Sequence, residues 1–187
     1  MHPVIETERL ILRPPQLGDE KPLNEAINRS LSVLQQWMPW AADPSFEPTM
    51  RFVIEGIASW SNEQQARDFP IVVFHKASRK IIGASGFNER SNPQVPMYEI
   101  GYWLDTQYTG LGLATETVSA LTKFAFKSFN AVRVQVVMQA DNDASKRVAE
   151  KCGFVLEATL KKYRVDCLSK QPADDCIFVR FDAEGLL

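Results

Sequence analysis

The sequence predicts an α/β fold with a mixed, mostly antiparallel sheet flanked by helices, and two observations predict it. First, three β-like runs follow one another with only turn-prone residues between them, at 69–76, 80–89 and 97–105. This order is typical of an antiparallel meander. Second, a helical pattern at 111–129 leads into the β-branched run 132–140. The third β-like run, this helix and this strand therefore form a βαβ unit.

The N-terminal third predicts one strand and two helices. The alternating stretch "ERLILRP" indicates a strand that ends at Pro14 and Pro15. Asp19 is placed to cap a first helix, whose apolar positions are Leu23, Ala26, Ile27, Leu31, Leu34 and Met38. A second helix follows Pro48 and ends in the polar "SNEQQARD", with apolar positions Met50, Val53, Ile54, Ile57 and Trp60.

The C-terminal half predicts two further helices and two further strands. The helix at 111–129 carries Ala114, Val118, Leu121 and Ala125 on one face. A short helix at 143–151 leads to Gly153, a residue suited to a C-terminal cap. The last β-like stretches are 154–165 and 176–182.

Composition narrows the class of protein. A chain of 187 residues with 45% hydrophobic and 24% charged residues is expected to form a single domain, 1–187. Its apolar runs fall short of the roughly 18 residues that a membrane span requires, and its acidic start is unlike a signal peptide, so we expect a cytoplasmic protein without membrane partners.

A net charge of -2 without a basic block argues against direct nucleic acid binding. Cys152, Cys167 and Cys176 form no CxxC pair, so neither a disulfide framework nor a metal site is expected.

The stretch "QYTGLGLATE" (107–116) puts two glycines at the junction of a strand and a helix. Free N–H groups and the positive end of the helix dipole meet at such a junction, which favours an anion. Gly110 and Gly112 let a phosphate approach the backbone, and Ala114 and Thr115 keep the first helical turn small. The alternative is that the glycines only make a tight turn.

Two familiar phosphate motifs do not fit this turn. A P-loop requires a lysine after its last glycine, and no lysine occurs between Gln107 and Lys123. The dinucleotide fingerprint would have Thr115 at its third glycine position, and 127–140 contains no acidic residue for a ribose. Nucleoside triphosphate hydrolysis and dinucleotide binding are therefore disfavoured.

The segment from Glu99 to Phe154 resembles the acetyl-CoA-binding half of the GNAT superfamily of N-acetyltransferases. "QYTGLGLAT" is similar to the Q/R-x-x-G-x-G/A turn of that superfamily, and "NDASKRVAEKCGF" (142–154) is similar to a motif of its ribosomal-protein N-terminal acetyltransferases of the RimJ/RimL type. "TERLILRP" and "LQQWMPWA" resemble the same branch more loosely. The resemblance covers nearly the whole chain.

The resemblance implies a GNAT-like fold and acetyl-CoA as cosubstrate. In that fold the strand carrying Glu99 and the strand at 132–140 splay apart, and the pantetheine arm lies between them. Backbone groups of the turn would hold the coenzyme A diphosphate. The cofactor-binding residues implied are Ile100, Tyr102, Leu104, Gln107, Gly110, Leu111, Gly112, Leu113, Ala114, Thr115, Asn142 and Ser145.

Acetyl transfer to an amine requires a base, and Glu99 is the first candidate because it lies on the strand before the turn. Period-two alternation would place Glu99 and Trp103 on one face and Tyr102 on the other. A solvent-facing carboxylate is the competing interpretation, and Glu89 is the second candidate. We expect the oxyanion to meet backbone N–H groups of a bulged strand around 100–104.

The leaving thiolate must take up a proton, and Ser145 is the candidate to donate it. Many members of the superfamily carry a tyrosine at the position that is Ala149 here, whereas Ser145 matches the serine of the RimJ/RimL branch. A serine near a helix start is otherwise a cap or a polar filler. Asn142 is expected to cap this helix and to contact the cofactor.

Four tryptophans complete the candidates: Trp37, Trp40, Trp60 and Trp103. Such aromatics usually pack in the core. In the alternative, the loop at 37–48 caps an acceptor pocket, and Trp40 or Trp103 lines a channel for the first residues of a polypeptide.

The sequence thus predicts an acetyl-CoA-dependent N-acetyltransferase whose acceptor is the N-terminal α-amine of a protein, a ribosomal protein first of all. An α-amine has a pKa near 8, so roughly a tenth is neutral at pH 7. Acetylation of a polyamine, an amino acid or an antibiotic is a second hypothesis, and an inactive coenzyme A sensor is a third. The sequence is also compatible with a homodimer.

Overall fold

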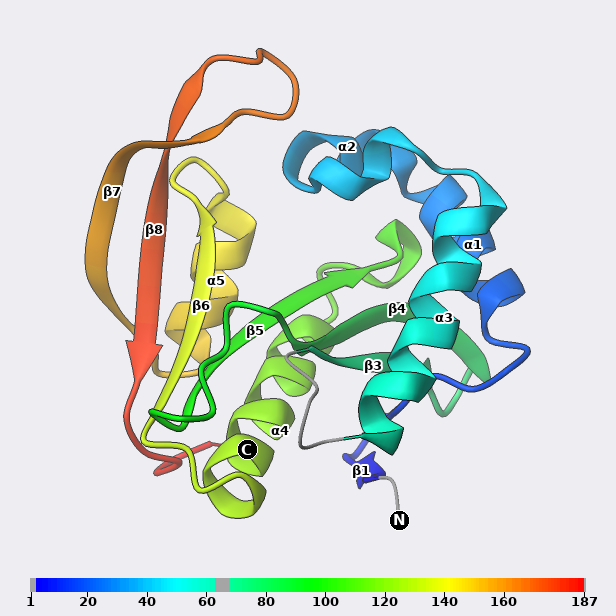
Figure 1. Ribbon diagram of the computed structural model, residues 1–187, viewed down its shortest axis with the longest axis horizontal. Helices are drawn as coiled ribbons and strands as arrows, with labels where there is room; N and C mark the ends of the chain where they lie inside the picture. Colours follow the sequence, from blue (N-terminus) through cyan, green and yellow to red (C-terminus); the bar gives the residue numbers. More distant parts are fainter. Residues whose placement is uncertain (1–2, 63–67, 187) are drawn as a thin grey trace.

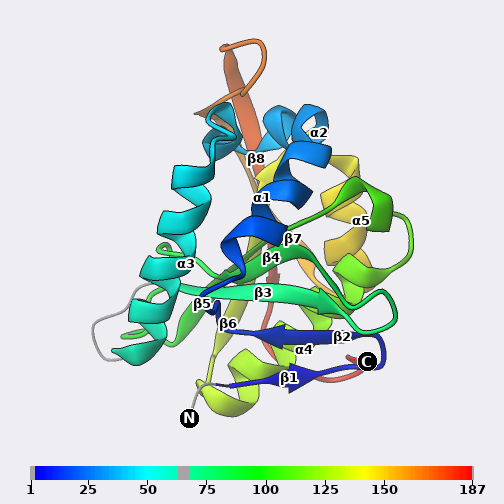
Figure 2. The ribbon, with the colours of Figure 1, turned by 90° about the vertical axis from the view of Figure 1, so that its right-hand side faces the viewer.

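An eight-stranded mixed sheet runs through the protein, whose computed structural model describes residues 3–62 and 68–186 (Figures 1 and 2). The order in the sheet is β1-β2-β3-β4-β5-β6-β8-β7, and all neighbours are antiparallel except β5 and β6, which are parallel. The predicted meander and βαβ unit are confirmed. The strands are β1 (Ile5–Glu6), β2 (Leu10–Arg13), β3 (Phe69–His75), β4 (Lys80–Phe87), β5 (Met97–Leu104), β6 (Arg133–Gln139), β7 (Val155–Val165) and β8 (Pro172–Arg180).

Helices cover both faces of the sheet. Val72 and Ala84 of the meander pack with Leu23 and Val53 from two N-terminal helices, whereas Ile71 of the same strand belongs to the cluster beneath α4. The alternation of neighbouring strand residues therefore separates the two layers. The helical segments are α1 (Glu20–Arg29), α2 (Leu31–Trp37), η1 (Pro39–Ala42), α3 (Phe46–Ser61), η2 (Thr106–Tyr108), α4 (Leu113–Ser128) and α5 (Asp143–Lys151).

The predicted first helix is two helices, α1 and α2, which meet at Ser30. The buried Ser30 hydroxyl accepts a hydrogen bond from the Thr106 N–H at 2.9 Å, so a tertiary contact holds the break. Asp19 occupies the N-cap position but does not cap with its side chain. Its carboxylate pairs with Arg13 instead, at 2.6 Å.

The predicted inward face of the second helix is partly wrong. Met50 and Ile54 are 40% and 52% exposed, although Val53 and Trp60 are buried as expected. The buried stripe includes Gly56, where a Cβ would lie 2.7 Å from Pro70 and 2.8 Å from Pro15. The face of the helix that contains Gly56 therefore packs against the rest of the protein, and this is not the face that hydropathy alone predicts. Its polar end was predicted over 61–68, of which 63–67 lie outside the described residues.

The C-terminal elements follow their predicted positions closely. Helix α5 has the predicted bounds, and Gly153 after it adopts a φ of +73°, as a C-terminal cap requires. Strand β8 begins four residues earlier than the predicted 176, at Pro172. Within 3–62 and 68–186, no helix is both long and apolar enough to cross a membrane.

Candidate active site

The parallel strands β5 and β6 form a fork. They pair only through Met97–Glu99 and Arg133–Gln135, and Figure 1 shows them diverging toward their carboxyl ends. On its other side β5 stays paired with β4: the Asn88 N–H donates to the Glu99 carbonyl at 2.9 Å, and the Asp105 N–H to the Ile82 carbonyl at 2.7 Å. Backbone groups alternate along a strand, so those of Ile100, Tyr102 and Leu104 face the open side of the fork.

The bulge expected around 100–104 is absent from the described pairing. The register between β4 and β5 is continuous from Phe87 opposite Ile100 to Gly83 opposite Leu104. A register shift occurs instead in the pairing of β3 with β4, between Val73 and Phe74. The backbone N–H and C=O groups of β5 that face the fork beyond Glu99 lack a strand partner because β5 diverges from β6, and no inserted residue is needed.

A cavity of about 690 Å³ lies at the fork. Its wall combines β5, β6, the start of α5 and the segment from α2 to η1. The structure thereby brings together most of the predicted site residues that lie outside the glycine turn: Glu99, Ile100, Tyr102, Asn142 and Ser145 all line the cavity, as does Glu89, the second candidate base.

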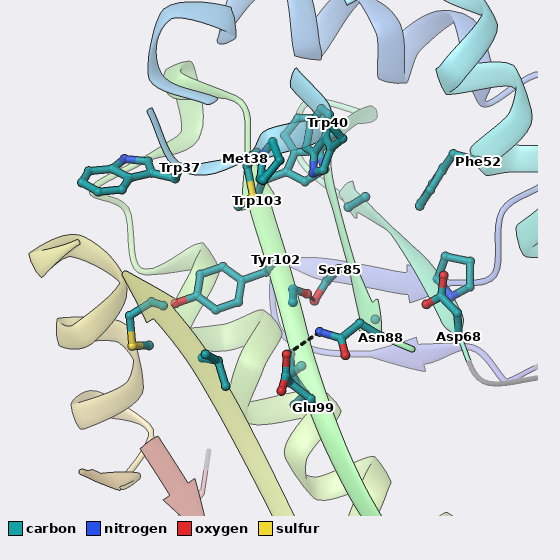
Figure 3. A pocket seen from close by; sticks show the side chains of 18 of the residues that line it. Trp37, Met38, Trp40, Phe52, Asp68, Ser85, Asn88, Glu99, Tyr102 and Trp103 are labelled. Carbon is teal, nitrogen blue, oxygen red and sulfur yellow. Dashed lines mark hydrogen bonds between the residues drawn. The ribbon is translucent and has the colours of Figure 1, made fainter. Parts of the chain in front are cut away.

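Glu99 lies at the last paired rung of the fork and is only 3% exposed, so the solvent-facing alternative is wrong. One carboxylate oxygen accepts a hydrogen bond from the Asn88 amide at 2.8 Å (Figure 3), and the other accepts one from the Gln135 amide at 2.7 Å. Each carboxylate oxygen has a second lone pair, so these bonds leave capacity for a proton or a water. The side chain therefore links β5 to β6 and to the residue that follows β4, and it still borders the cavity.

Ser145 is paired with a residue that the sequence did not single out for its side chain. Its Oγ lies 2.7 Å from the phenol oxygen of Tyr102, which reaches across the fork from β5 to α5. Burial raises the pKa of Tyr102 above its usual value, more than the hydrogen bond with Ser145 lowers it. The phenol therefore stays protonated throughout the neutral range. Alternation correctly put Tyr102 opposite Glu99, but only the fork lets both border one cavity.

Asn142 caps α5 as predicted: its side-chain oxygen accepts a hydrogen bond from the Ser145 N–H at 3.1 Å. Ser145 is therefore not the cap of this helix, which removes one of the alternatives for it. Ala149, one turn further on, is fully buried in the core.

Part of the cavity wall is aromatic and acidic. Trp37, Trp40 and Trp103 line it, with the Trp40 and Trp103 rings 5.9 Å apart (Figure 3), whereas Trp60 is buried in the core.

Asp68 also lines the cavity, away from these tryptophans (Figure 3). Although the residue has solvent access, desolvation of its carboxyl group and repulsion from nearby Glu89 and Glu55 raise its pKa from 3.8 to about 6. No sequence pattern marked Asp68, because its neighbours come from separate elements.

The glycine turn lies outside the lining of this cavity. Gly110 and Gly112 adopt φ values of +75° and +79°, which favour glycine, and a Cβ at Gly110 would meet nothing within 4 Å. Gly112 is the N-cap of α4, so the first N–H groups of that helix have no helical partner. The exposed turn thus offers open donors at the start of α4. Gln107 is exposed, and its N–H is directed to Asp105.

Comparison with known proteins places this geometry in a family. The model of the acetyltransferase (GNAT) domain family matches residues 9–155. A ribosomal-protein-serine acetyltransferase of Escherichia coli is 31% identical over 156 residues, which cover 83% of this chain and 84% of that protein. The uncharacterized N-acetyltransferase p20 of Bacillus licheniformis is 31% identical over 170 residues, covering 84% and 85%.

Solved structures show the same fold. RimL, a ribosomal alpha-N-protein acetyltransferase, in complex with coenzyme A has a TM-score of 0.85 at 24% identity, covering 97% of this chain and 99% of that one. The acetyltransferase MccE in complex with acetyl-CoA and AMP has a TM-score of 0.83 at 23% identity, covering 94% of both chains. With its matched domain, its relatives and its forked sheet, the chain belongs to the GNAT acetyltransferase family.

Proposed function

We propose that this acetyltransferase moves the acetyl group of acetyl-CoA to the N-terminal α-amine of a protein, with ribosomal proteins as the first acceptor class to test. The observation that carries the proposal is the cavity at the fork, which both Glu99 and the Ser145–Tyr102 pair border. The E. coli relative named for a ribosomal protein supports the acceptor class. The continuous eight-stranded sheet supports a single domain over 1–187.

The described residues fit acetyl-CoA as the acetyl donor. The open edge of β5 offers backbone groups at Ile100, Tyr102 and Leu104 to the amides of a pantetheine arm. The open space at Gly110 and the free N–H groups at the start of α4 suit a diphosphate, which would contact Leu111, Gly112, Leu113, Ala114 and Thr115. Gln107 and Asn142 remain predicted contacts beside these two regions.

Acetyl-CoA supplies an activated acyl group in its thioester, and the chain must manage two protons around it. We assign Glu99 the acceptance of the amine proton, directly or through a water that uses the free lone pairs of its carboxylate. Ser145 donates its proton toward the departing sulfur and regains one from solvent after the thiol has left. Tyr102, whose pKa is raised by burial, keeps its own proton and donates a hydrogen bond to the serine oxygen while negative charge develops there.

The aromatic and acidic wall suits a basic acceptor. Tryptophan faces and carboxylates both attract an ammonium group. Asp68 and Glu89 border the cavity together with Trp40 and Trp103, so the acceptor amine would approach Glu99 past these side chains. An α-amine, with a pKa near 8, loses its proton there far more readily than a lysine near 10.4.

The decisive experiment measures thiol release from acetyl-CoA with a panel of acceptors. The panel contains peptides with the N-terminal sequences of ribosomal proteins, the same peptides with a blocked N-terminus and an internal lysine, polyamines, amino acids and aminoglycosides. We expect turnover with free N-terminal peptides only. Turnover with small amines alone would overturn the acceptor class, and binding of coenzyme A without turnover on any acceptor would favour a sensor.

Glu99→Gln tests the base. The expected result is a kcat at least about a hundredfold lower at neutral pH with the Kd for coenzyme A unchanged, because an amide cannot accept the proton. A kcat equal to that of the wild type would exclude Glu99, and Glu89→Gln is the matched variant because Glu89 borders the same cavity from a more exposed position.

A further inference from the structure

Arg9, immediately before β2, contacts the glycine turn although it lies a hundred residues away in the sequence. Its Nη1 donates to the Leu111 carbonyl at 2.8 Å, and its Nε donates to Glu116 Oε2 at 2.7 Å. Its backbone N–H also donates to Glu116 Oε1, at 2.9 Å. The Arg9 side chain thus connects the middle of the turn and the first turn of α4 to the segment before β2.

Glu116 creates an electrostatic difficulty for an anionic ligand at this place. Partial burial opposes its ionisation, but hydrogen bonds from Thr7 and Arg9 outweigh it and hold the pKa of Glu116 below its usual range. A negative charge therefore lies one helical turn from the donors of the glycine turn. It would repel a diphosphate unless a cation stands beside it.

Arg9 provides that cation in a suitable position. Its Nη2 lies 3.5 Å from the point where a Cβ of Gly112 would be, and this nitrogen makes no hydrogen bond to any residue that the structure describes. Two guanidinium nitrogens, Nε and Nη1, thus already donate hydrogen bonds, and Nη2 is left beside the turn. A planar guanidinium with several donors is well suited to phosphate oxygens.

We propose that Arg9 is a positioning residue for the coenzyme diphosphate: it orients the turn through the Leu111 carbonyl, cancels the charge of Glu116 and directs Nη2 toward the phosphates. The inference rests on the proposed use of acetyl-CoA. It goes beyond that proposal because it assigns a side chain from the N-terminal segment to a site built by backbone groups.

The test compares coenzyme A with a thioester that lacks the diphosphate. Calorimetry with coenzyme A, and thiol release from acetyl-CoA and from S-acetylpantetheine, are measured for the wild type and for Arg9→Met. We expect Kd for coenzyme A to rise about tenfold or more, since one charge-assisted hydrogen bond is worth that amount, while kcat/KM for S-acetylpantetheine changes less than about twofold. Arg51→Met, which removes an arginine paired with Glu47 on α3, is the control and should change neither.

Two further variants separate positioning from mere folding. Arg9→Lys keeps the charge and should have a Kd between those of the wild type and Arg9→Met. Adding Glu116→Gln to Arg9→Met should restore part of the lost affinity, because the uncompensated carboxylate is gone; a purely structural clamp predicts no recovery. An equal loss for both thioesters, or an unchanged Kd, overturns the inference. A wild type that binds no coenzyme A would instead overturn the proposed function.

Discussion

Single residues at the fork acquire their roles from a partner on another strand or helix. Ser145 alone is an ordinary serine in the first turn of α5, and Tyr102 alone is an ordinary tyrosine of β5. Their oxygens lie 2.7 Å apart at the cavity wall, and to Ser145 in this pair we assign protonation of the leaving thiolate. In that proposal Ser145 acts in place of the tyrosine that many members of the superfamily carry at the position of Ala149.

Ser145→Ala is expected to lower kcat about a hundredfold while leaving the Kd for coenzyme A within about threefold, because proton transfer is lost and the backbone contacts are kept. Tyr102→Phe should lower kcat less, since the serine hydroxyl remains. Steady-state kinetics and calorimetry measure both quantities. Tyr163→Phe, on exposed β7, is the matched control. A wild-type kcat in Ser145→Ala would exclude Ser145 as the acid.

Asp68 should make stability depend on pH. Its pKa is raised from 3.8 to about 6, so the folded state holds the proton more tightly than the unfolded chain does. The resulting stabilisation is complete below about pH 3.8 and is lost as the pH rises through about 6. We expect the free energy of unfolding of the wild type, relative to Asp68→Asn, to fall between pH 4 and pH 7 in urea titrations. Parallel curves for the two proteins would show that Asp68 has an ordinary pKa.

Elements were predictable where one periodic pattern decided them. Helix α5 and the meander strands combine a clear period with capping or turn residues at their ends. The break between α1 and α2 was not predictable, because it depends on the Ser30 contact with Thr106, 76 residues away. The face of α3 was also misjudged, since the prolines that pack on Gly56 come from outside the helix.

The glycine turn offers a test at the same scale. Gly110→Ala should reduce affinity for coenzyme A by about tenfold or more, because a methyl group would enter the open space beside the turn, and the positive φ should cost about 1 kcal/mol of stability. Gly185→Ala is the matched control: its φ is +67° and a Cβ there would also meet nothing within 4 Å.

Both variants should lose similar stability in thermal unfolding, and only Gly110→Ala should lose affinity in calorimetry. Equal affinity in the two variants would remove the turn from the cofactor site.

At the scale of the whole molecule, one parallel pair interrupts an otherwise antiparallel sheet. The two halves of the sheet meet only over the short ladder from Met97 to Glu99, while the cavity occupies the opening beyond it. A ligand that bridges β5 and the start of α4 would add contacts where the sheet itself has none. Binding of that ligand is therefore expected to stabilise the whole fold.

Coenzyme A at about 100 times its Kd should raise Tm by about 5–10 °C, which corresponds to about 2.7 kcal/mol in a protein of this size. Differential scanning fluorimetry measures the shift. ATP and NAD at the same concentration are the controls, since they carry phosphates without a pantetheine arm and should produce little change. A shift that is equal for all three ligands would indicate general anion binding at the turn.

The sequence by itself determined the antiparallel meander, the βαβ unit, the glycine turn and the resemblance to the GNAT superfamily, because each depends on residues close to one another along the chain. Only the tertiary structure decided that Tyr102 meets Ser145, that Glu99 is buried between Asn88 and Gln135, and that Arg9 reaches the turn. The physical reason is that these contacts join segments far apart in sequence, which come together only when the chain folds.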